Sequence, residues 1–194
     1  MRFERLTLRT TDPDAARAFY EPLLEHGCPD VTTLPAQAVA RGARPHWLGW
    51  LGVDDVEATT AALLARGGQQ LSPGILRDPG GAVLGLTART STPLRPDVIW
   101  HQLMAPDVDA AAALYAPLFA VDDPPVAAVT SLTGHPEIHP QWLHHFRTRD
   151  LERTRAAVLA AGGLALPVFT LPSGVRIAAC DDPQGGAFGL MQPA

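Results

Sequence analysis

The histidines are the residues of this chain best suited to chemistry, and five of the seven lie between His101 and His145. An imidazole can bind a transition metal or act as a general base near neutral pH. The segment 135–140 carries a pair of histidines at the spacing of a zinc-binding helix, but its prolines are incompatible with that helix. We therefore expect a solvated loop there, and we keep His135 and His139, together with His145, as the alternative place for a metal.

His144 and His145 are neighbours in a segment with the composition of a strand, so their side chains are expected on opposite faces of a sheet. Arg147 falls on the same face as His145. A half-buried histidine beside an arginine is more often structural than catalytic. His145 is thus a candidate general base, with a structural role as the alternative.

The elements that position these residues occur twice in the chain. Residues 12–23 return as residues 107–118, at an offset of 95 (107 − 12). A register held in this way indicates a duplicated unit. We therefore expect two small domains, at residues 2–92 and 96–194.

The offset changes once, after the second helix of each copy. The turn that begins at Asp78 returns at Asp182, which is 104 residues later (182 − 78), so the second copy has gained nine residues (104 − 95). This gain is enough for one extra strand or hairpin arm, which we place around residues 174–180.

Each copy is expected to fold as strand, helix, short strands, strand, helix and strands. In the first copy a strand at residues 3–10 precedes Asp12, which caps a helix that extends to about Leu24. The following segment, up to Trp47, is rich in Pro, Gly and Ala and is expected to hold short strands and no helix. Tyr20 falls on the apolar face of its helix, so we predict a core role for it and for its equivalent in the second copy.

Composition excludes several classes of function. The 194 residues carry a formal charge of −5 with scattered arginines and no lysine, which argues against nucleic-acid binding, Schiff-base catalysis and a P-loop. Cys28 and Cys180 occupy non-equivalent places, which argues against a disulfide framework. No apolar run approaches a membrane span and no signal segment is evident, so we expect a cytoplasmic protein without membrane or nucleic-acid partners.

Several motifs together resemble the vicinal oxygen chelate superfamily, the group of glyoxalases, bleomycin-resistance proteins and extradiol dioxygenases. They are the segments 100–110, 141–143 and 182–192 and the glycine pair 162–163. The resemblance covers the whole chain twice over. It implies an α+β fold of tandem βαβββ modules, forming two small domains with curved mixed sheets and helices on the outer face.

The same resemblance argues against the metal chemistry of the family. Its metal enzymes place ligands on the first strand of a module and on the last strand after Asp-Pro. In this chain the six corresponding positions are Arg5, Leu48, Gly85, Trp100, Leu143 and Gly189. None of these residue types ligates a metal as His or Glu does. We therefore expect no metal and no other cofactor.

The family geometry also implies which side chains face the concave pockets. In the second copy we expect ligand-binding residues at Trp100, Gln102, Met104, His145, Arg147, Gly189 and Met191. In the first copy we expect them at Arg5, Arg9 and Trp50. Aromatic rings beside arginines suit a planar anion, and a protonated histidine would add to that attraction.

The leading hypothesis is a metal-free protein that sequesters or carries a small aromatic or carboxylated molecule, as bleomycin-resistance proteins do. The chain would act as an intramolecular pseudo-dimer, either as a monomer or as a homodimer. One alternative is an enzyme of the superfamily, with a non-standard metal site or with metal-independent His and Arg chemistry. A second alternative is a structural or regulatory partner whose pockets are filled by its own side chains.

Overall fold

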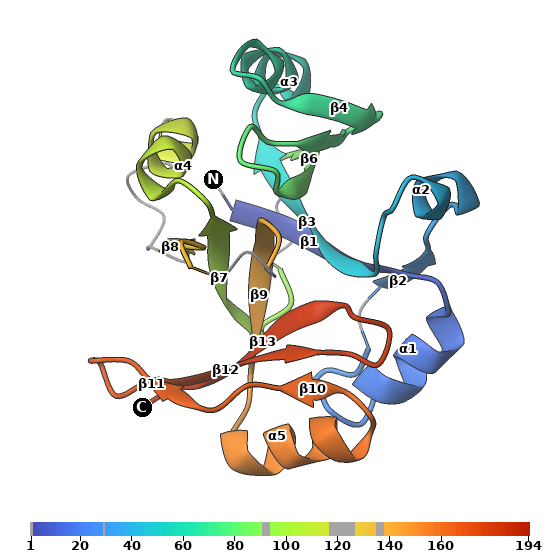
Figure 1. Ribbon diagram of the computed structural model, residues 1–194, viewed down its shortest axis with the longest axis vertical. Helices are drawn as coiled ribbons and strands as arrows, with labels where there is room; N and C mark the ends of the chain where they lie inside the picture. Colours follow the sequence, from blue (N-terminus) through green and yellow to red (C-terminus); the bar gives the residue numbers. More distant parts are fainter. Residues whose placement is uncertain (1, 29, 91–93, 117–126, 135–137) are drawn as a thin grey trace. The chain divides into compact units, whose positions relative to one another are not determined.

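The computed structural model describes residues 2–28, 30–90, 94–116, 127–134 and 138–194 (Figure 1). The strands are β1 (Arg2–Thr10), β2 (Asp30–Thr33), β3 (His46–Val53), β4 (Gln69–Ser72), β5 (Ile75–Arg77), β6 (Val83–Ala88), β7 (Val98–Ala105), β8 (Ala127–Ser131), β9 (Gln141–Arg147), β10 (Leu164–Ala165), β11 (Phe169–Thr170), β12 (Arg176–Asp181) and β13 (Ala187–Gln192). The helices are α1 (Pro13–Tyr20), α2 (Ala36–Ala40), α3 (Val56–Ala65), α4 (Val108–Tyr115) and α5 (Leu151–Ala160). Among the described residues, no helix has the length and apolar composition needed to span a membrane.

The strands form two mixed sheets that follow the two sequence copies. One sheet has the order β2-β1-β3-β6-β5-β4, and the other has the order β10-β12-β13-β9-β7-β8, with β11 paired to β12. The pairs β1 with β2, β3 with β6, β7 with β8 and β9 with β13 are parallel, whereas the pairs made by β5 and β12 are antiparallel. The expected α+β class with mixed sheets is confirmed.

Local sequence signals set the helix boundaries. Asp12 and Asp107 each follow the first strand of a copy, and each accepts a hydrogen bond from the backbone N–H three residues on, at 3.0 and 2.9 Å. Gly67 and Gly162 end α3 and α5 with φ of 92° and 84°, a conformation that favours glycine. The two copies thus place equivalent residues in equivalent elements, as predicted.

Two boundaries differ from expectation. Helix α1 ends at Tyr20 and not at Leu24, because Pro22 has no N–H to donate into a continuing helix. The expectation that no helix lies before Trp47 is wrong, because the alanine-rich segment after Pro35 forms the short helix α2. The extra strand of the second copy is β11, an arm on β12 without a counterpart in the first sheet. Its expected place around residues 174–180 is wrong, because most of that segment belongs to β12, the equivalent of β5 at the offset of 104.

By their contacts, the residues group into two compact units that do not follow the sequence copies. Unit 1 contains residues 1–6, 48–94 and 101–143, and unit 2 contains residues 7–47, 95–100 and 144–194. Each unit therefore draws residues from both copies. The ranges 2–92 and 96–194 describe the repeat and its two sheets, and as separate domains they stay a prediction.

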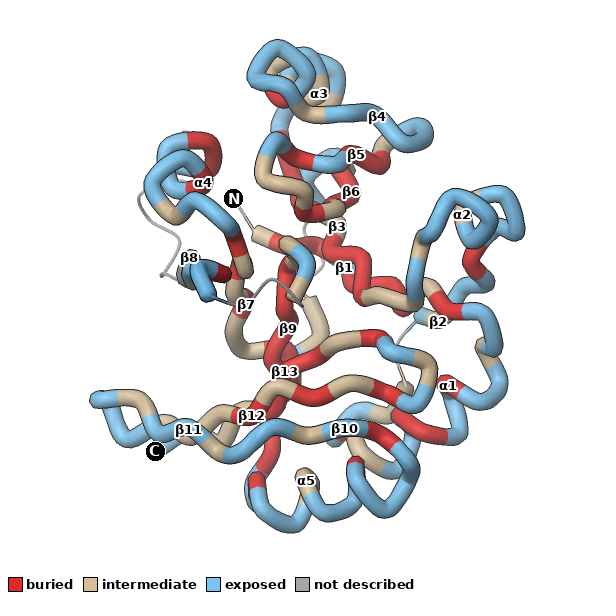
Figure 2. Tube along the Cα trace, viewed as in Figure 1, coloured by how far each residue is buried: buried red, intermediate tan, exposed pale blue. Residues whose placement is uncertain are grey.

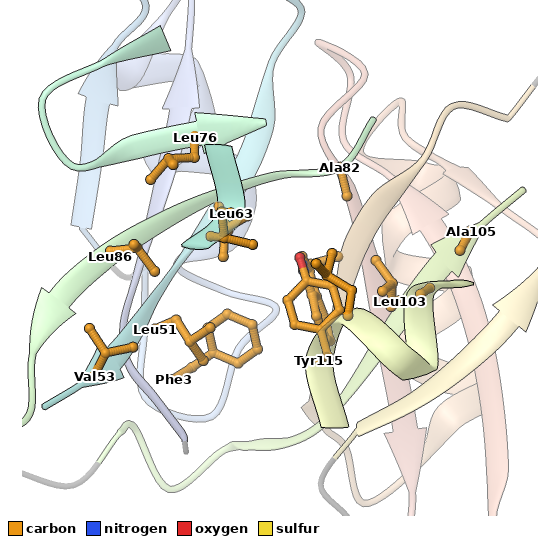
Figure 3. Packing of buried hydrophobic residues seen from close by; sticks show 14 residues of the cluster. Phe3, Leu51, Val53, Leu63, Leu76, Ala82, Leu86, Leu103, Ala105 and Tyr115 are labelled. Atoms are coloured by element: carbon orange, nitrogen blue, oxygen red, sulfur yellow. The ribbon is translucent and has the colours of Figure 1, made fainter. Parts of the chain in front are cut away.

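Unit 1 has a core of aliphatic side chains around three rings (Figure 3). Trp142 packs edge-on against Phe3 and against Tyr115, with ring centroids 5.2 Å apart in both pairs. Helix α3 packs on β4 and β6, and α4 packs beside β8. Leu63 is the buried residue of α3, which fixes that helix to the core.

Unit 2 has a more aromatic core. Tyr20 lies 5.2 Å from both Trp47 and Phe188, measured between ring centroids, and Phe19 lies 6.2 Å from Phe188. Helix α5 packs on β10, β12 and β13, with the rest of the helix largely exposed (Figure 2). Edge-to-face pairs of this kind add to the stabilisation that burial of the rings already gives.

In each unit a buried tyrosine from one copy donates a hydrogen bond to a buried aspartate from the other copy. Tyr115 donates to Asp78 over 2.9 Å in unit 1, and Tyr20 donates to Asp182 over 3.0 Å in unit 2. Burial raises the pKa of Asp78, and the hydrogen bond from Tyr115 acts in the opposite direction. Both tyrosines are core residues, as predicted.

We expect Tyr115→Phe and Tyr20→Phe each to lower the free energy of unfolding by about 1.5 to 3 kcal/mol, because each leaves a buried carboxylate without its phenol donor. Urea titration followed by far-UV circular dichroism measures this loss. Arg153→Ala, at an exposed position of α5, is the control and should leave the unfolding midpoint unchanged. A tyrosine variant as stable as the parent would show that the hydrogen bond has no net stabilising effect.

Candidate functional site

In unit 2 the candidate site is built from three strands. Gly189 of β13 lies directly opposite His145 of β9 in a parallel pair. A Cβ atom added to Gly189 would overlap the imidazole of His145, so that the ring occupies the space of the missing side chain. Trp100 of β7 stacks against the same imidazole, with centroids 4.5 Å apart and planes inclined by 43°. Only a glycine at position 189 permits this arrangement.

The electrostatic state of His145 differs from the one expected. Its side chain is 1% exposed. Burial lowers the pKa of His145 to about 4, and a hydrogen bond with the backbone of Leu190 opposes this shift only in part. The imidazole is therefore neutral at physiological pH. A contribution of protonated His145 to the attraction of an anion is therefore not supported, because burial disfavours the imidazolium.

The equivalent positions of the first copy carry the same arrangement in unit 1. Gly85 of β6 lies opposite Trp50 of β3, and a Cβ atom added to Gly85 would lie 2.5 Å from the indole ring. The guanidinium carbon of Arg5 lies 4.3 Å from the centroid of the Trp50 ring, within the range of a cation–π interaction. A ring over a glycine, stacked with a side chain from the first strand, thus occurs once in each copy.

The remaining predicted residues are distributed over both units. Arg147 and Met191 lie opposite each other in β9 and β13, on the face that carries His145 and Gly189. Arg9 is also in unit 2, where it pairs in register with Thr32 and where burial lowers the pKa of its guanidinium.

The other two predicted residues are in unit 1. The side-chain amide of Gln102 donates to the hydroxyl of Thr130 over 2.6 Å. Met104 lines a cavity beside α4. The structure therefore brings together Trp100, His145, Arg147, Gly189 and Met191 in unit 2, and Arg5 and Trp50 in unit 1.

The residues at the metal positions of the family do not fit a metal. In each copy a ring covers the glycine of the last strand, so the place of a ligating side chain is taken by Trp50 or His145. Leu48 and Leu143 are buried and have no donor atom. Over the part of the chain that the structure describes, no three His, Cys, Asp or Glu side chains are grouped to hold an ion. We therefore derive no step through a metal.

The other histidines do not form a cluster with His145 among the described residues. His101 packs against Phe3 with centroids 4.5 Å apart, which makes it part of the unit 1 core. His144 is fully buried, and His139 is exposed. His135 lies outside the described residues, so the loop expected there stays a prediction.

Unit 1 contains a cavity that was not expected from the sequence, which we call the α4 cavity. Its volume is about 450 Å³, and it lies between α4, the end of β7 and the turn 78–82. A signal for it exists in the alignment of the two copies, because Gly80 stands where the second copy has Gln184, at the offset of 104. The turn at Gly80 therefore has no side chain to fill this space, whereas Gln184 fills the equivalent space beside the turn in unit 2.

No family model matches the chain. Two relatives, both named "Putative glyoxylase CFP32", come from Mycobacterium bovis and Mycobacterium tuberculosis. Each is 27% identical over 243 aligned positions that cover 96% of this chain and 93% of the relative. The aligned region is longer than the 194 residues of this chain, so the relatives contain insertions that this chain lacks.

Solved structures of similar fold include several enzymes. The Mn(II)-bound glyoxalase of Novosphingobium aromaticivorans has a TM-score of 0.59 at 14% identity, with 98% of this chain and 81% of that chain covered. The 2,3-dioxygenase LapB of Pseudomonas sp. KL28 has a TM-score of 0.61 at 11% identity, with coverage of 100% and 92%.

Homoprotocatechuate 2,3-dioxygenase of Brevibacterium fuscum, in complex with 3,4-dihydroxyphenylacetate, has a TM-score of 0.63 at 14% identity, with coverage of 98% and 80%. At these identities the likeness is one of fold. The comparisons confirm the resemblance found in the sequence: this chain has the fold of the vicinal oxygen chelate superfamily of glyoxalases and extradiol dioxygenases.

Proposed function

We propose that the protein binds a small aromatic or carboxylated molecule without a metal, at the face of unit 2 that carries Trp100, His145 and Arg147. The observation that carries this proposal is the neutral imidazole lying over Gly189 and stacked on Trp100. It replaces a ligating side chain with an aromatic surface. The site can therefore offer stacking and a guanidinium, and it has no donor set for a metal.

The strand register supports a surface that offers both an aromatic ring and a guanidinium. Arg147 follows His145 by two residues, so both side chains belong to the same face of β9, and Met191 lies beside Arg147 on β13. Arg147 is exposed, whereas Trp100 is half-buried. A planar ligand would stack on the indole while its carboxylate pairs with the guanidinium, whose fork matches that geometry.

The position of the rings also favours a second candidate, a structural or regulatory role. In both copies a side chain of the protein itself, Trp50 or His145, already occupies the space above the glycine. A protein with this role would bind no small molecule at either place. The solved neighbours are enzymes, but a catalytic role for His145 has the least support, because the ring is 1% exposed and its low pKa makes it a weak base at neutral pH.

The purified protein is expected to hold substoichiometric Zn, Fe, Mn or Ni after dialysis, because the six family positions lack ligating atoms. Inductively coupled plasma mass spectrometry measures the content. An equivalent of one of these metals per chain would overturn the metal-free proposal and direct attention to His135, His139 and His145.

The aromatic carboxylate 3,4-dihydroxyphenylacetate, seen bound to the Brevibacterium fuscum enzyme, is a suitable probe. We expect it to bind without added metal, and Arg147→Ala to weaken binding by about 10- to 100-fold, since a hydrogen-bonded ion contact contributes about 1.5 to 3 kcal/mol. Trp100→Ala is expected to cost a similar factor through lost stacking. Isothermal titration calorimetry measures the Kd, with Arg153→Ala as the control. Equal affinity of Arg147→Ala and the parent would refute this site, and no binding at all would favour the structural role.

The pKa of His145 predicts a specific dependence of stability on pH. Its folded value of about 4 is below the unfolded value of 6.5, so its stabilising contribution is complete above pH 6.5 and is lost as the pH falls toward 4. Relative to His145→Phe, the parent should lose roughly 2 to 3 kcal/mol of unfolding free energy between those limits, at about 1.36 kcal/mol per pKa unit. Urea titrations from pH 8 to pH 4 test this. A constant difference between the two proteins would show that the ring titrates normally.

A further inference from the structure

The α4 cavity of unit 1 has the size and lining of a ligand site. Its volume of about 450 Å³ falls within the range of small-molecule pockets, about 300 to 1,000 Å³. The lining is mostly apolar, with Leu103, Met104 and Leu114 among its members. Its polar groups include Asp78, Asp107 and Arg66. An occupant would therefore need an apolar body and a polar group.

The equivalent place in unit 2 shows what such a cavity accommodates. There the side-chain amide of Gln184 fills the space between the turn and the start of α1. Its oxygen accepts from the backbone N–H of Asp12 over 2.9 Å and from the hydroxyl of Thr11 over 3.0 Å, and it also contacts the hydroxyl of Thr10. Its nitrogen donates to the backbone carbonyl of Asp12 over 2.9 Å. A primary amide thus makes paired hydrogen bonds with one backbone residue.

In unit 1 the residues that fill this space are smaller. At the offsets of 104 and 95, Gly80 replaces Gln184, and Ala105 and Pro106 replace the two threonines. A phenyl ring is lost as well, because Leu114, which lines the cavity, replaces Phe19 of the unit 2 core. Such large-to-small differences leave a cavity where the surroundings do not collapse.

The backbone group that binds the amide is retained. Asp107 is the N-cap of α4 with φ −125° and ψ 106°, close to the φ −133° and ψ 93° of Asp12 in α1. Asp107 lines the cavity, and its carbonyl accepts from the N–H of Ala111 over 3.1 Å, as the carbonyl of Asp12 does from Ala16 over 3.1 Å. We therefore expect the N–H and C=O of Asp107 to be placed as those of Asp12 are toward Gln184. Asp78 and Asp107 would repel a carboxylate, and the guanidinium of Arg66 donates to the carbonyl of Ala62 in its own helix over 3.3 Å. An amide can both donate and accept. The polar end of the cavity is thus best matched by a neutral amide.

We propose that the α4 cavity binds a small apolar molecule with a terminal primary carboxamide, which takes the place that the Gln184 side chain fills in unit 2. The amide pairs with the backbone N–H and C=O of Asp107, and the apolar body lies against Leu103, Met104 and Leu114. This site is distinct from the face of unit 2 described above, and it stands whether or not that face binds an aromatic carboxylate.

Hexanamide is the probe, because it combines a primary amide with an apolar chain. We expect saturable binding in the millimolar range, with changes in the backbone amide resonances of Asp107 and Ala110 in ¹⁵N–¹H NMR spectra. Hexanoate has the same shape but is an anion without donors, and N,N-dimethylhexanamide lacks N–H groups. Each should bind at least about tenfold more weakly, which corresponds to about 1.4 kcal/mol.

Gly80→Gln is the decisive variant, because it restores the side chain that fills the equivalent space in unit 2. A Cβ atom at Gly80 has no neighbour nearer than 3.4 Å, so the backbone there accepts a side chain. It should raise the thermal unfolding midpoint and weaken hexanamide binding by at least about tenfold. Ala110→Leu fills the cavity from α4 and should also weaken binding, whereas Arg153→Gln at an exposed position should not.

Three outcomes would overturn the proposal. They are an absence of hexanamide binding to the parent at tens of millimolar, unchanged binding in folded Gly80→Gln and Ala110→Leu, and equal affinity for hexanamide and hexanoate. None of these results depends on Arg147 or Trp100, so a failure here is separate from a failure of the aromatic site.

Discussion

The hydrogen bond from a helix tyrosine of one copy to a turn aspartate of the other copy is the contact on which both compact units depend. Tyr115 and Asp78 make it in unit 1, and Tyr20 and Asp182 make it in unit 2. In each case both groups are buried, so neither has water as an alternative partner. The same aspartate also accepts backbone N–H groups of its own turn, which holds the turn in shape for the strand that follows.

That strand carries the glycine on which the candidate site of each copy depends. At this position the resemblance implies a metal ligand in the enzymes of the family. In this chain a ring packs over the glycine instead, Trp50 over Gly85 and His145 over Gly189. The change is more than the loss of donor atoms, because the vacated space is filled by apolar and aromatic surface. Restoring a ligand at the glycine would require displacing the ring as well.

The sequence predicted the parts of this structure that depend on local chemistry. The helix ends are recognisable from residue type, because an N-cap favours aspartate and a positive φ favours glycine. Asp12, Asp107 and the glycines after α3 and α5 are examples. The sharing of each unit between the copies could not be predicted, because a tyrosine on an apolar helix face does not reveal which aspartate it meets. The α4 cavity was missed for a related reason. Glycine is common in turns, and only the contacts of Gln184 in the structure show that a side chain is lacking at Gly80.

The reciprocal composition of the two units has a consequence for how such a chain assembles. Because each unit needs a tyrosine helix from one copy and an aspartate turn from the other, a chain with a single copy would have to pair with a second molecule to complete either unit. Tethering both copies in one polypeptide replaces that encounter with an intramolecular one, at an effective concentration of about millimolar for a short linker. Folding of the tandem chain is therefore independent of dilution, and a cut between the copies would make it dependent again.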